Sequence, residues 1–176
     1  MHSLQSVTFT EVKNTNSKSS AFPEDDALSE YLFSMIMIGI DPGKITGIGI
    51  TIGQDKQAIS MPIHKALQFV EDLTHEDKIH VRVEDARKRK WFGKNSVAKK
   101  QGAGSIKRDS TIWNDFLKDL QKKSNGLLTF EMLHPIKGAT KIAAAPFKKL
   151  TGIQKQTNEH GRDAFMLIIN FKPISL

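Results

Sequence analysis

The chain has 176 residues, 39% of them hydrophobic, which is enough for one domain with a sizeable core. It contains no cysteine, so a disulfide framework and a thiolate metal site are both excluded. No apolar run approaches the roughly 18 residues of a membrane span, and the N-terminus lacks a signal-peptide pattern. We therefore expect a soluble intracellular protein.

The positive charge is unevenly distributed. The net charge is +7, but residues 1–34 carry −3, so the remaining chain carries +10. Ten lysines and arginines lie between Arg82 and Arg108, against Glu84 and Asp85. Such a density suits a polyanion such as nucleic acid, and a solvated basic loop is the alternative.

Residues 1–34 and the rest of the chain differ in pattern. The first 34 residues are polar, rich in Ser, Asn, Thr and Lys, and show no periodicity. We expect a disordered or flexible extension there, followed by one compact domain over residues 35–176.

Three short strands are expected at the start of this domain. Residues 36–41 and 47–52 are apolar runs around Pro42-Gly43, a turn pair, and residues 58–61 follow a further turn at Gln54-Asp55. A helix is expected from Pro62, because apolar residues then recur at helical spacing.

Strands and helices alternate over the rest of the chain. Residues 79–84 alternate apolar and polar side chains, which predicts a half-buried strand. A basic loop whose glycines indicate mobility should follow. The remaining expected elements are a helix at 106–123 with Trp113 in the core, a strand at 127–133, a helix at 140–150 kinked near Pro146, and a helix at 159–171. This order predicts an α/β fold with a mixed five-stranded sheet flanked by helices.

Acidic residues stand where two of the expected strands end. If strands 36–41 and 79–84 pair in parallel, Asp41 and Glu84 lie at the same rim, about 4.8 Å apart across the sheet. Carboxylates at that separation repel one another unless a cation lies between them. Asp85 is an alternative to Glu84, although strand alternation sends the two side chains to opposite faces. A lone carboxylate after a strand can also be a simple cap or turn residue.

His160 and Asp163 can complete this cluster. They are three residues apart in an expected helix and share one face. Carboxylates with one imidazole suit Mg²⁺ or Mn²⁺, and two such ions can activate water and stabilise the leaving oxygen of a phosphodiester. The other histidines, His64, His75, His80 and His134, show no partner spacing and are expected at the surface.

The order of these motifs resembles that of the RuvC family of Holliday-junction resolvases. The shared features are Asp-Pro-Gly-Lys after a strand, then Gly-Ile-Gly, a strand that ends in Glu84, and His-Gly-Arg-Asp-Ala opening the last helix. The resemblance covers about residues 35–170. It implies an RNase H-like fold, and it implies that Asp41, Glu84 and Asp163 bind two metal ions with His160 in the fourth position. It also implies a homodimer that cuts four-way junctions.

The basic segment departs from classical members of the family and looks more like the small phage-encoded branch. General cleavage of branched DNA is therefore plausible. The residues expected to bind DNA are Arg87, Lys88, Arg89, Lys90, Trp91, Phe92, Lys94, Lys99, Lys100, Lys107, Arg108 and Lys137. Trp91 and Phe92 can stack on unpaired bases or can anchor the loop to the core. Lys141 is a candidate for catalytic support, with an exposed basic turn as the alternative.

The function expected is a Mg²⁺- or Mn²⁺-dependent endodeoxyribonuclease that resolves Holliday junctions or other branched DNA. It would act in a bacterial or phage-infected cytoplasm or another reducing compartment that contains DNA. Two alternatives stay open: a YqgF-like RNA nuclease, which shares the Gly-Ile-Asp-Pro-Gly opening, and a non-catalytic module that binds branched nucleic acid. An actin-like ATPase is disfavoured, because it needs two domains of this kind.

Overall fold

The computed structural model describes residues 35–74, 77–88, 97–135, 142–169 and 171, with residues 97–103 described by their backbone alone. The expected N-terminal extension, residues 1–34, lies outside these ranges. Among the described residues, no helix is long and apolar enough to cross a membrane.

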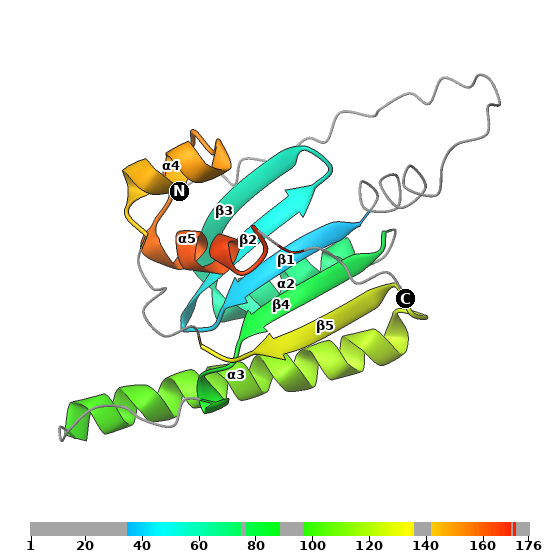
Figure 1. Cartoon of the computed structure of the whole chain (residues 1–176). Helices are drawn as coiled ribbons and strands as arrows, with labels where there is room; N and C mark the ends of the chain where they lie inside the picture. Colours follow the sequence, from blue (N-terminus) through cyan, green and yellow to red (C-terminus); the bar gives the residue numbers. More distant parts are fainter. Residues whose placement is uncertain (1–34, 75–76, 89–96, 136–141, 170, 172–176) are drawn as a thin grey trace, which may run out of the picture.

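A mixed five-stranded sheet forms the centre of the molecule, in the order β3-β2-β1-β4-β5 (Figure 1). The strands are β1 (Ile36–Asp41), β2 (Ile45–Ile52), β3 (Asp55–Pro62), β4 (Ile79–Glu84) and β5 (Leu128–Leu133). β1, β2 and β3 pair antiparallel, whereas β4 lies parallel to both β1 and β5. This confirms the predicted α/β fold with a mixed five-stranded sheet.

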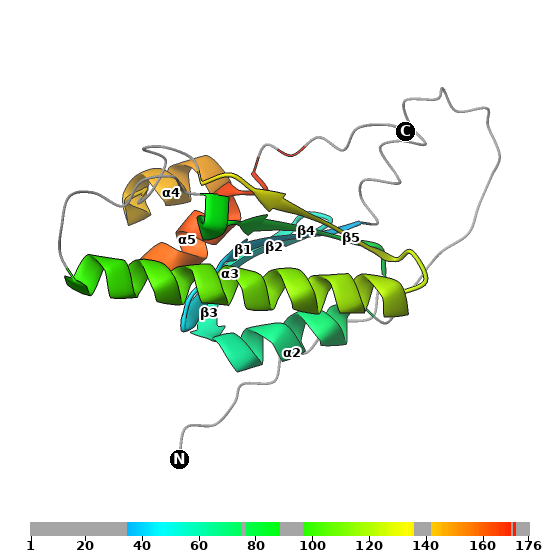
Figure 2. The ribbon, with the colours of Figure 1, turned by 90° about the horizontal axis from the view of Figure 1, so that it is seen from below.

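Helices cover both faces of the sheet (Figure 2). One face carries α2 (Ile63–Leu73) and α3 (Val97–Lys123), and the other carries α5 (Glu159–Met166) with α4 (Ala144–Thr151) beside it. A short 3-10 turn, η1 (Ala86–Lys88), follows β4. The alternation of the strands separates two apolar clusters, one on each side of the sheet.

The larger cluster lies under α2 and α3. Isoleucines of β1 and β2 pack there with Val70 of α2 and with Trp113 and Leu117 of α3. Trp113 is fully buried, as the sequence predicts. The smaller cluster joins Phe147 of α4 to Phe165 of α5, whose rings meet edge to face at 5.7 Å.

Helix α3 is nine residues longer at its start than expected, because it begins at Val97 rather than at Ile106. Gly102 and Gly104 therefore lie in a helix, and the mobile loop predicted for this stretch is wrong from residue 97 onward. Once the C-terminal half is fixed by the core, each further residue adds a helical hydrogen bond at little cost. Asn125 and Gly126, both with positive φ, end the helix as predicted.

Several other boundaries differ from prediction, among them the start of β2, which is Ile45 rather than residue 47. β3 begins at Asp55, because it pairs with β2 along its whole length. α4 begins at Ala144 and runs unbroken to Thr151, with Pro146 in its first turn, where proline is tolerated because its nitrogen needs no helical hydrogen bond. α5 ends at Met166 rather than at Phe171, because Leu167 and Ile168 donate to carbonyls three residues back and tighten the chain into a turn.

Candidate active site

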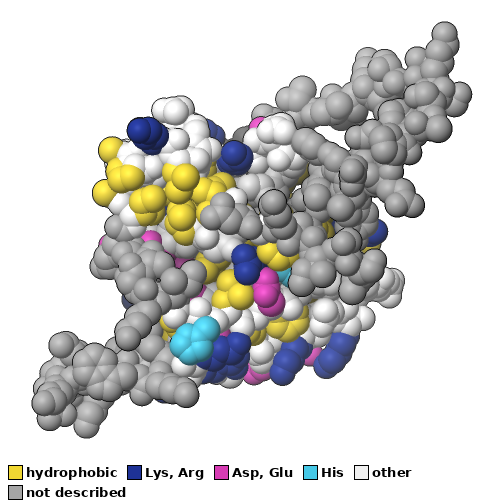
Figure 3. Space-filling view, in the orientation of Figure 1, with side chains coloured by type: hydrophobic (Ala, Val, Ile, Leu, Met, Phe, Trp, Pro, Cys, Tyr) yellow, Lys and Arg dark blue, Asp and Glu magenta, His cyan; other side chains and the backbone are white. Residues whose placement is uncertain are grey.

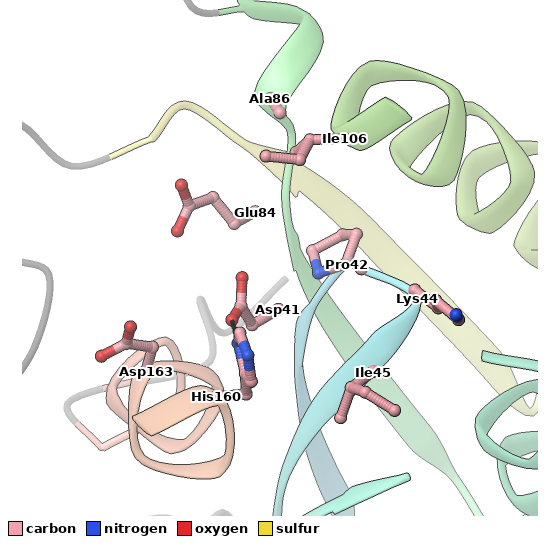
Figure 4. A pocket seen from close by; sticks show the side chains of 10 residues that line it. Asp41, Pro42, Lys44, Ile45, Glu84, Ala86, Ile106, His160 and Asp163 are labelled. Carbon is pink, nitrogen blue, oxygen red and sulfur yellow. Dashed lines mark hydrogen bonds and ion pairs between the residues drawn. The ribbon is translucent and has the colours of Figure 1, made fainter. Parts of the chain in front are cut away.

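A pocket of about 350 Å³ lies at the rim of the sheet where β1 and β4 end (Figure 4). Its carboxylates and its histidine come from β1, β4 and α5, Lys44 comes from the β1–β2 turn, and its apolar lining comes from that turn, β2, η1 and α3. The lining residues are Asp41, Pro42, Gly43, Lys44, Ile45, Glu84, Ala86, Ile106, His160 and Asp163. Four of the residues singled out from the sequence, Asp41, Glu84, His160 and Asp163, thus share one pocket.

The parallel pairing of β1 and β4 brings the first two carboxylates together. Ile40 is in register with Val83, so Asp41 and Glu84 are the next residues along two adjacent strands. The apolar residues of both strands point into the core under α3. Asp41 and Glu84 therefore point to the opposite face, where α5 lies.

Glycines let α5 lie directly on the sheet. A Cβ added to Gly47 would lie 2.0 Å from the carbonyl oxygen of His160, and one added to Gly39 would lie 2.0 Å from that of Ala164. A Cβ on Gly49 would meet the Cα of Phe165 at 2.2 Å. The helix that carries His160 and Asp163 can therefore reach Asp41 only because these strands lack side chains at the contact.

His160 contacts Asp41 directly. Its Nδ1 lies 3.1 Å from Oδ2 of Asp41, and the two side chains are 44% and 23% exposed. The N-cap residue Asn158 fixes the first turn of α5 by accepting a hydrogen bond from the backbone N–H of Gly161. The contact uses one ring nitrogen of His160 and leaves Nε2 for another partner.

The pKa of Asp41 is raised to about 6. Burial is the largest cause, the hydrogen bond from His160 opposes it, and the negative charges of Glu84 and Asp163 raise the pKa further. Near neutral pH the pocket therefore holds a carboxylate whose charge is unfavourable in its surroundings. Strongly raised pKa values of this kind are typical of functional sites.

Asp85, the alternative to Glu84, has a different role. It is 2% exposed, and its two carboxylate oxygens accept hydrogen bonds from Nε and Nη2 of Arg87, both at 2.8 Å. Burial acts to raise the pKa of Asp85, but the hydrogen bonds from Arg87 outweigh burial, and this pKa lies below its usual value. Asp85 holds the turn after β4 together, and it is not among the residues that line the pocket.

Among the residues predicted to bind DNA, those that the structure describes belong to η1 and α3, the elements that contribute Ala86 and Ile106 to the pocket. Arg87 and Lys88 belong to η1, where Arg87 is engaged by Asp85 and Lys88 donates to the carbonyl of Met132. Lys107 and Arg108 follow Ile106 in α3, and Ile106 itself lines the pocket. Lys99 and Lys100 lie in α3, in the part described by its backbone alone. The other predicted residues, Arg89, Lys90, Trp91, Phe92, Lys94, Lys137 and Lys141, lie outside the described ranges.

The donor types of the pocket fit a hard divalent cation, but their present spacing is not that of a metal site. Three carboxylates and one imidazole are the ligands that Mg²⁺ and Mn²⁺ accept. Burial is the main reason for the raised pKa of Asp41, and repulsion by Glu84 and Asp163 adds to it. A cation would relieve that repulsion. Within the described part of the chain, however, no three His, Cys, Asp or Glu residues form a group that could hold an ion as placed.

Two features of the site were not predicted from the sequence. Ile45 and Ile106 give the pocket an apolar side, and both are unusually exposed for large hydrophobic residues, at 42% and 41%. The sequence pattern makes both look like core residues, so their exposure could not be predicted from it. The contact role of Gly39, Gly47 and Gly49 was also missed, although three glycines within two isoleucine-rich strands were a usable signal of close approach.

Comparison with known proteins does not assign the chain to a family. No protein-family model matches the chain, and no curated protein matches its sequence. Among solved structures, the chain is similar to T. thermophilus RuvC in complex with a Holliday junction substrate, with 14% sequence identity and a TM-score of 0.48. The match covers 77% of this chain and 90% of that one. The assignment of the pocket therefore depends on this chain's own residues.

Proposed function

We propose that the protein is a metal-dependent endonuclease that hydrolyses phosphodiester bonds in branched DNA, including four-way junctions. The observation that carries the proposal is the convergence of Asp41, Glu84, Asp163 and His160, from three elements, in one pocket at the end of the sheet. A non-catalytic binding module would have no need for three carboxylates next to a surface that must attract phosphates. The motif resemblance to RuvC nucleases supports the same assignment.

In this proposal Asp41, Glu84, Asp163 and His160 bind Mg²⁺ or Mn²⁺, two ions per site. The ions would supply an activated water and would stabilise the charge on the leaving oxygen. Above about pH 6 Asp41 is ionised, and its carboxylate can accept a hydrogen bond from the Nδ1–H of His160. Below that pH Asp41 holds a proton. The pocket is therefore ready to bind a cation only when Asp41 is ionised.

The positive charge near the pocket supports a nucleic-acid substrate. The N-terminal half of α3 extends beyond the sheet in Figures 1 and 2. Ile106 of this helix lines the pocket, and Lys107 and Arg108 are the next two residues of the chain. Figure 3 shows further lysines and arginines gathered along the edge of the molecule formed by α3. A phosphate backbone along this helix would pass the carboxylates. We further propose a homodimer, because a four-way junction offers two equivalent strands to cut.

A substrate panel tests the proposal against its alternatives. The panel contains a four-way junction, a Y-fork, a linear duplex, an RNA–DNA hybrid and single-stranded RNA, each with Mg²⁺ or Mn²⁺. We expect cleavage of the branched DNAs and little or none of the linear duplex. Preferential cleavage of RNA would favour the YqgF-like alternative. Tight junction binding without cleavage under any metal condition would favour the binding module.

A further inference from the structure

Arg82 is bonded to two different elements on the same face of the sheet as the pocket. Its Nε donates to Oε1 of Glu131 on β5 at 2.5 Å, and its Nη1 donates to the carbonyl oxygen of Leu167 at 2.6 Å. Leu167 is the C-cap residue of α5. Arg82 lies two residues before Glu84 on β4, so both side chains point to the face that carries α5. One guanidinium therefore connects the strand of Glu84 to the end of the helix of Asp163.

The surroundings of Arg82 hold its side chain in this position. The ring of Phe171 lies 5.0 Å from the guanidinium carbon and stacks on His80 at 4.7 Å. His80 in turn contacts Thr129 at 2.8 Å and Glu131 at 3.4 Å. The side chains of Arg82 and His80 are 22% and 16% exposed, so the expectation that His80 is a surface residue is wrong. A side chain packed on several sides has few other rotamers available.

The opposite end of α5 is also fixed to the sheet. The side-chain amide of Asn158 donates to the hydroxyl of Ser60 on β3, and its oxygen caps the first turn of the helix. The helix has only eight residues, and His160 and Asp163 lie between these two attachments. Its position over the glycines of β1 and β2 is thus set at one end by Asn158 and at the other by Arg82.

We infer that Arg82 is a positioning residue for the nuclease reaction, acting through α5 to set Asp163 and His160 against Asp41 and Glu84. This inference deepens the proposed function and rests on it. The guanidinium of Arg82 also lies at the C-terminal end of α5, where the backbone carbonyls favour positive charge. The planar shape of the guanidinium matters as well as its charge, because a lysine ammonium at this position could not hold Glu131 and the Leu167 carbonyl in the same rigid geometry.

The test compares Arg82→Met and Arg82→Lys with the parent and with Lys65→Met, which removes an exposed cation on α2. Hydrogen–deuterium exchange is measured over residues 159–169. Single-turnover cleavage and binding of a four-way junction are measured well below the melting temperature. In Arg82→Met we expect exchange in α5 to become about tenfold faster, because a charged hydrogen bond is lost. We expect cleavage at saturating junction to slow by about 100-fold through misplacement of Asp163, with little change in binding.

Arg82→Lys should lie between the parent and Arg82→Met in both measurements, and Lys65→Met should match the parent. The inference is overturned if α5 in Arg82→Met exchanges as slowly as in the parent, or if folded Arg82→Met cleaves at the parent rate. If Arg82→Met does not fold, Arg82→Lys decides, and parental exchange and rate in that variant would also overturn it. The exchange measurement needs no enzyme activity. A parent that cleaves no branched DNA would therefore defeat the proposed function, while exchange alone would still decide whether Arg82 positions α5.

Discussion

Asp41 is the residue whose environment most clearly favours function over stability. Its pKa is about 6 in the folded chain against a usual value of 3.8, so the folded state holds the proton more tightly than the unfolded state does. The stability that this proton contributes is present at pH values below 3.8 and is lost as the pH rises through about 6. At neutral pH the ionised side chain should therefore destabilise the metal-free protein.

Asp41→Asn should raise the free energy of unfolding in chelator by about 2 kcal/mol at pH 8, because the amide keeps the shape without the buried charge. The difference should shrink toward zero near pH 4. Urea unfolding at both pH values measures it, with Asp119→Asn, an exposed position on α3, as the control. A variant that is less stable than the parent at pH 8 would show that Asp41 has a stabilising partner in the metal-free protein.

His160 should set the pH at which Asp41 becomes available. Its hydrogen bond and its charge both lower the pKa of Asp41, against the larger effect of burial. His160→Ala should therefore shift the acidic limb of the pH–rate profile to higher pH, by about half a unit or more, and should slow cleavage by about 100-fold. His160→Asp supplies a carboxylate in place of the imidazole and should cost less. If the alanine variant cleaves as fast as the parent from pH 6 to 8, His160 has no part in the chemistry.

The pocket residues could be predicted from the sequence where the spacing of a strand or a helix fixes their position. Asp41 and Glu84 each end an apolar strand, and His160 and Asp163 have the spacing of one helix face. Arg82 was not predictable in this way. Its acceptor at Leu167 is 85 residues away in sequence, and a polar residue between two buried valines suggests only an exposed strand face.

At the scale of elements, the absence of side chains at Gly39, Gly47 and Gly49 lets α5 lie directly on β1 and β2. Apolar alternation predicted both strands and the helix, but not their distance from each other, because a glycine in an apolar strand fits a turn, a bulge or a close contact equally well. The start of α3 was misjudged for a related reason. Glycines and lysines after the basic loop favour a loop locally, whereas the buried half of the helix continues the helical backbone through them.

Gly47→Ala should separate α5 from the sheet. The new Cβ would lie 2.0 Å from the carbonyl oxygen of His160, so the backbone must move, and we expect a loss of about 3 kcal/mol in stability. Cleavage should fall by about 100-fold or more because Asp163 and His160 move with the helix. Thermal unfolding and single-turnover cleavage measure the two effects.

Gly104→Ala is the matched control for this substitution. A Cβ at Gly104 meets no atom within 4 Å, and the residue lies inside α3. Alanine should therefore stabilise the protein by about 0.5–1 kcal/mol and leave cleavage unchanged. If Gly47→Ala is as well tolerated as Gly104→Ala, the close contact between α5 and β2 is not needed for the site.

At the scale of the whole molecule, the excess of positive charge predicts DNA binding that weakens steeply with salt. Replacing Lys107 by glutamine should reduce the slope of log K against log salt by about 1. Arg87 and Arg108 are unsuitable for this test, because the removal of either one leaves a buried carboxylate, Asp85 or Asp109, without its partner. Fluorescence anisotropy with a labelled junction measures the slope.

The same helix provides the control. Lys123 lies in the last turn of α3, about 24 Å along the helix from Lys107. Replacing it by glutamine removes the same charge far from the pocket, so the slope should change less. Equal effects at the two ends would mean that DNA binding follows total charge and has no preferred path past the carboxylates.

Single-turnover cleavage of a four-way junction tests most directly whether the pocket is a metal-dependent active site. The parent, Glu84→Gln and Asp163→Asn are compared, each with Mg²⁺ or Mn²⁺ and with chelator. We expect cleavage by the parent only when metal is present. We expect both variants to bind the junction nearly as well as the parent but to cleave it about 1,000-fold more slowly, because each lacks a carboxylate that would hold a metal ion at the reacting phosphate. Cleavage by the parent in chelator, or parental cleavage rates in either variant, would show that the pocket is not a metal-dependent active site.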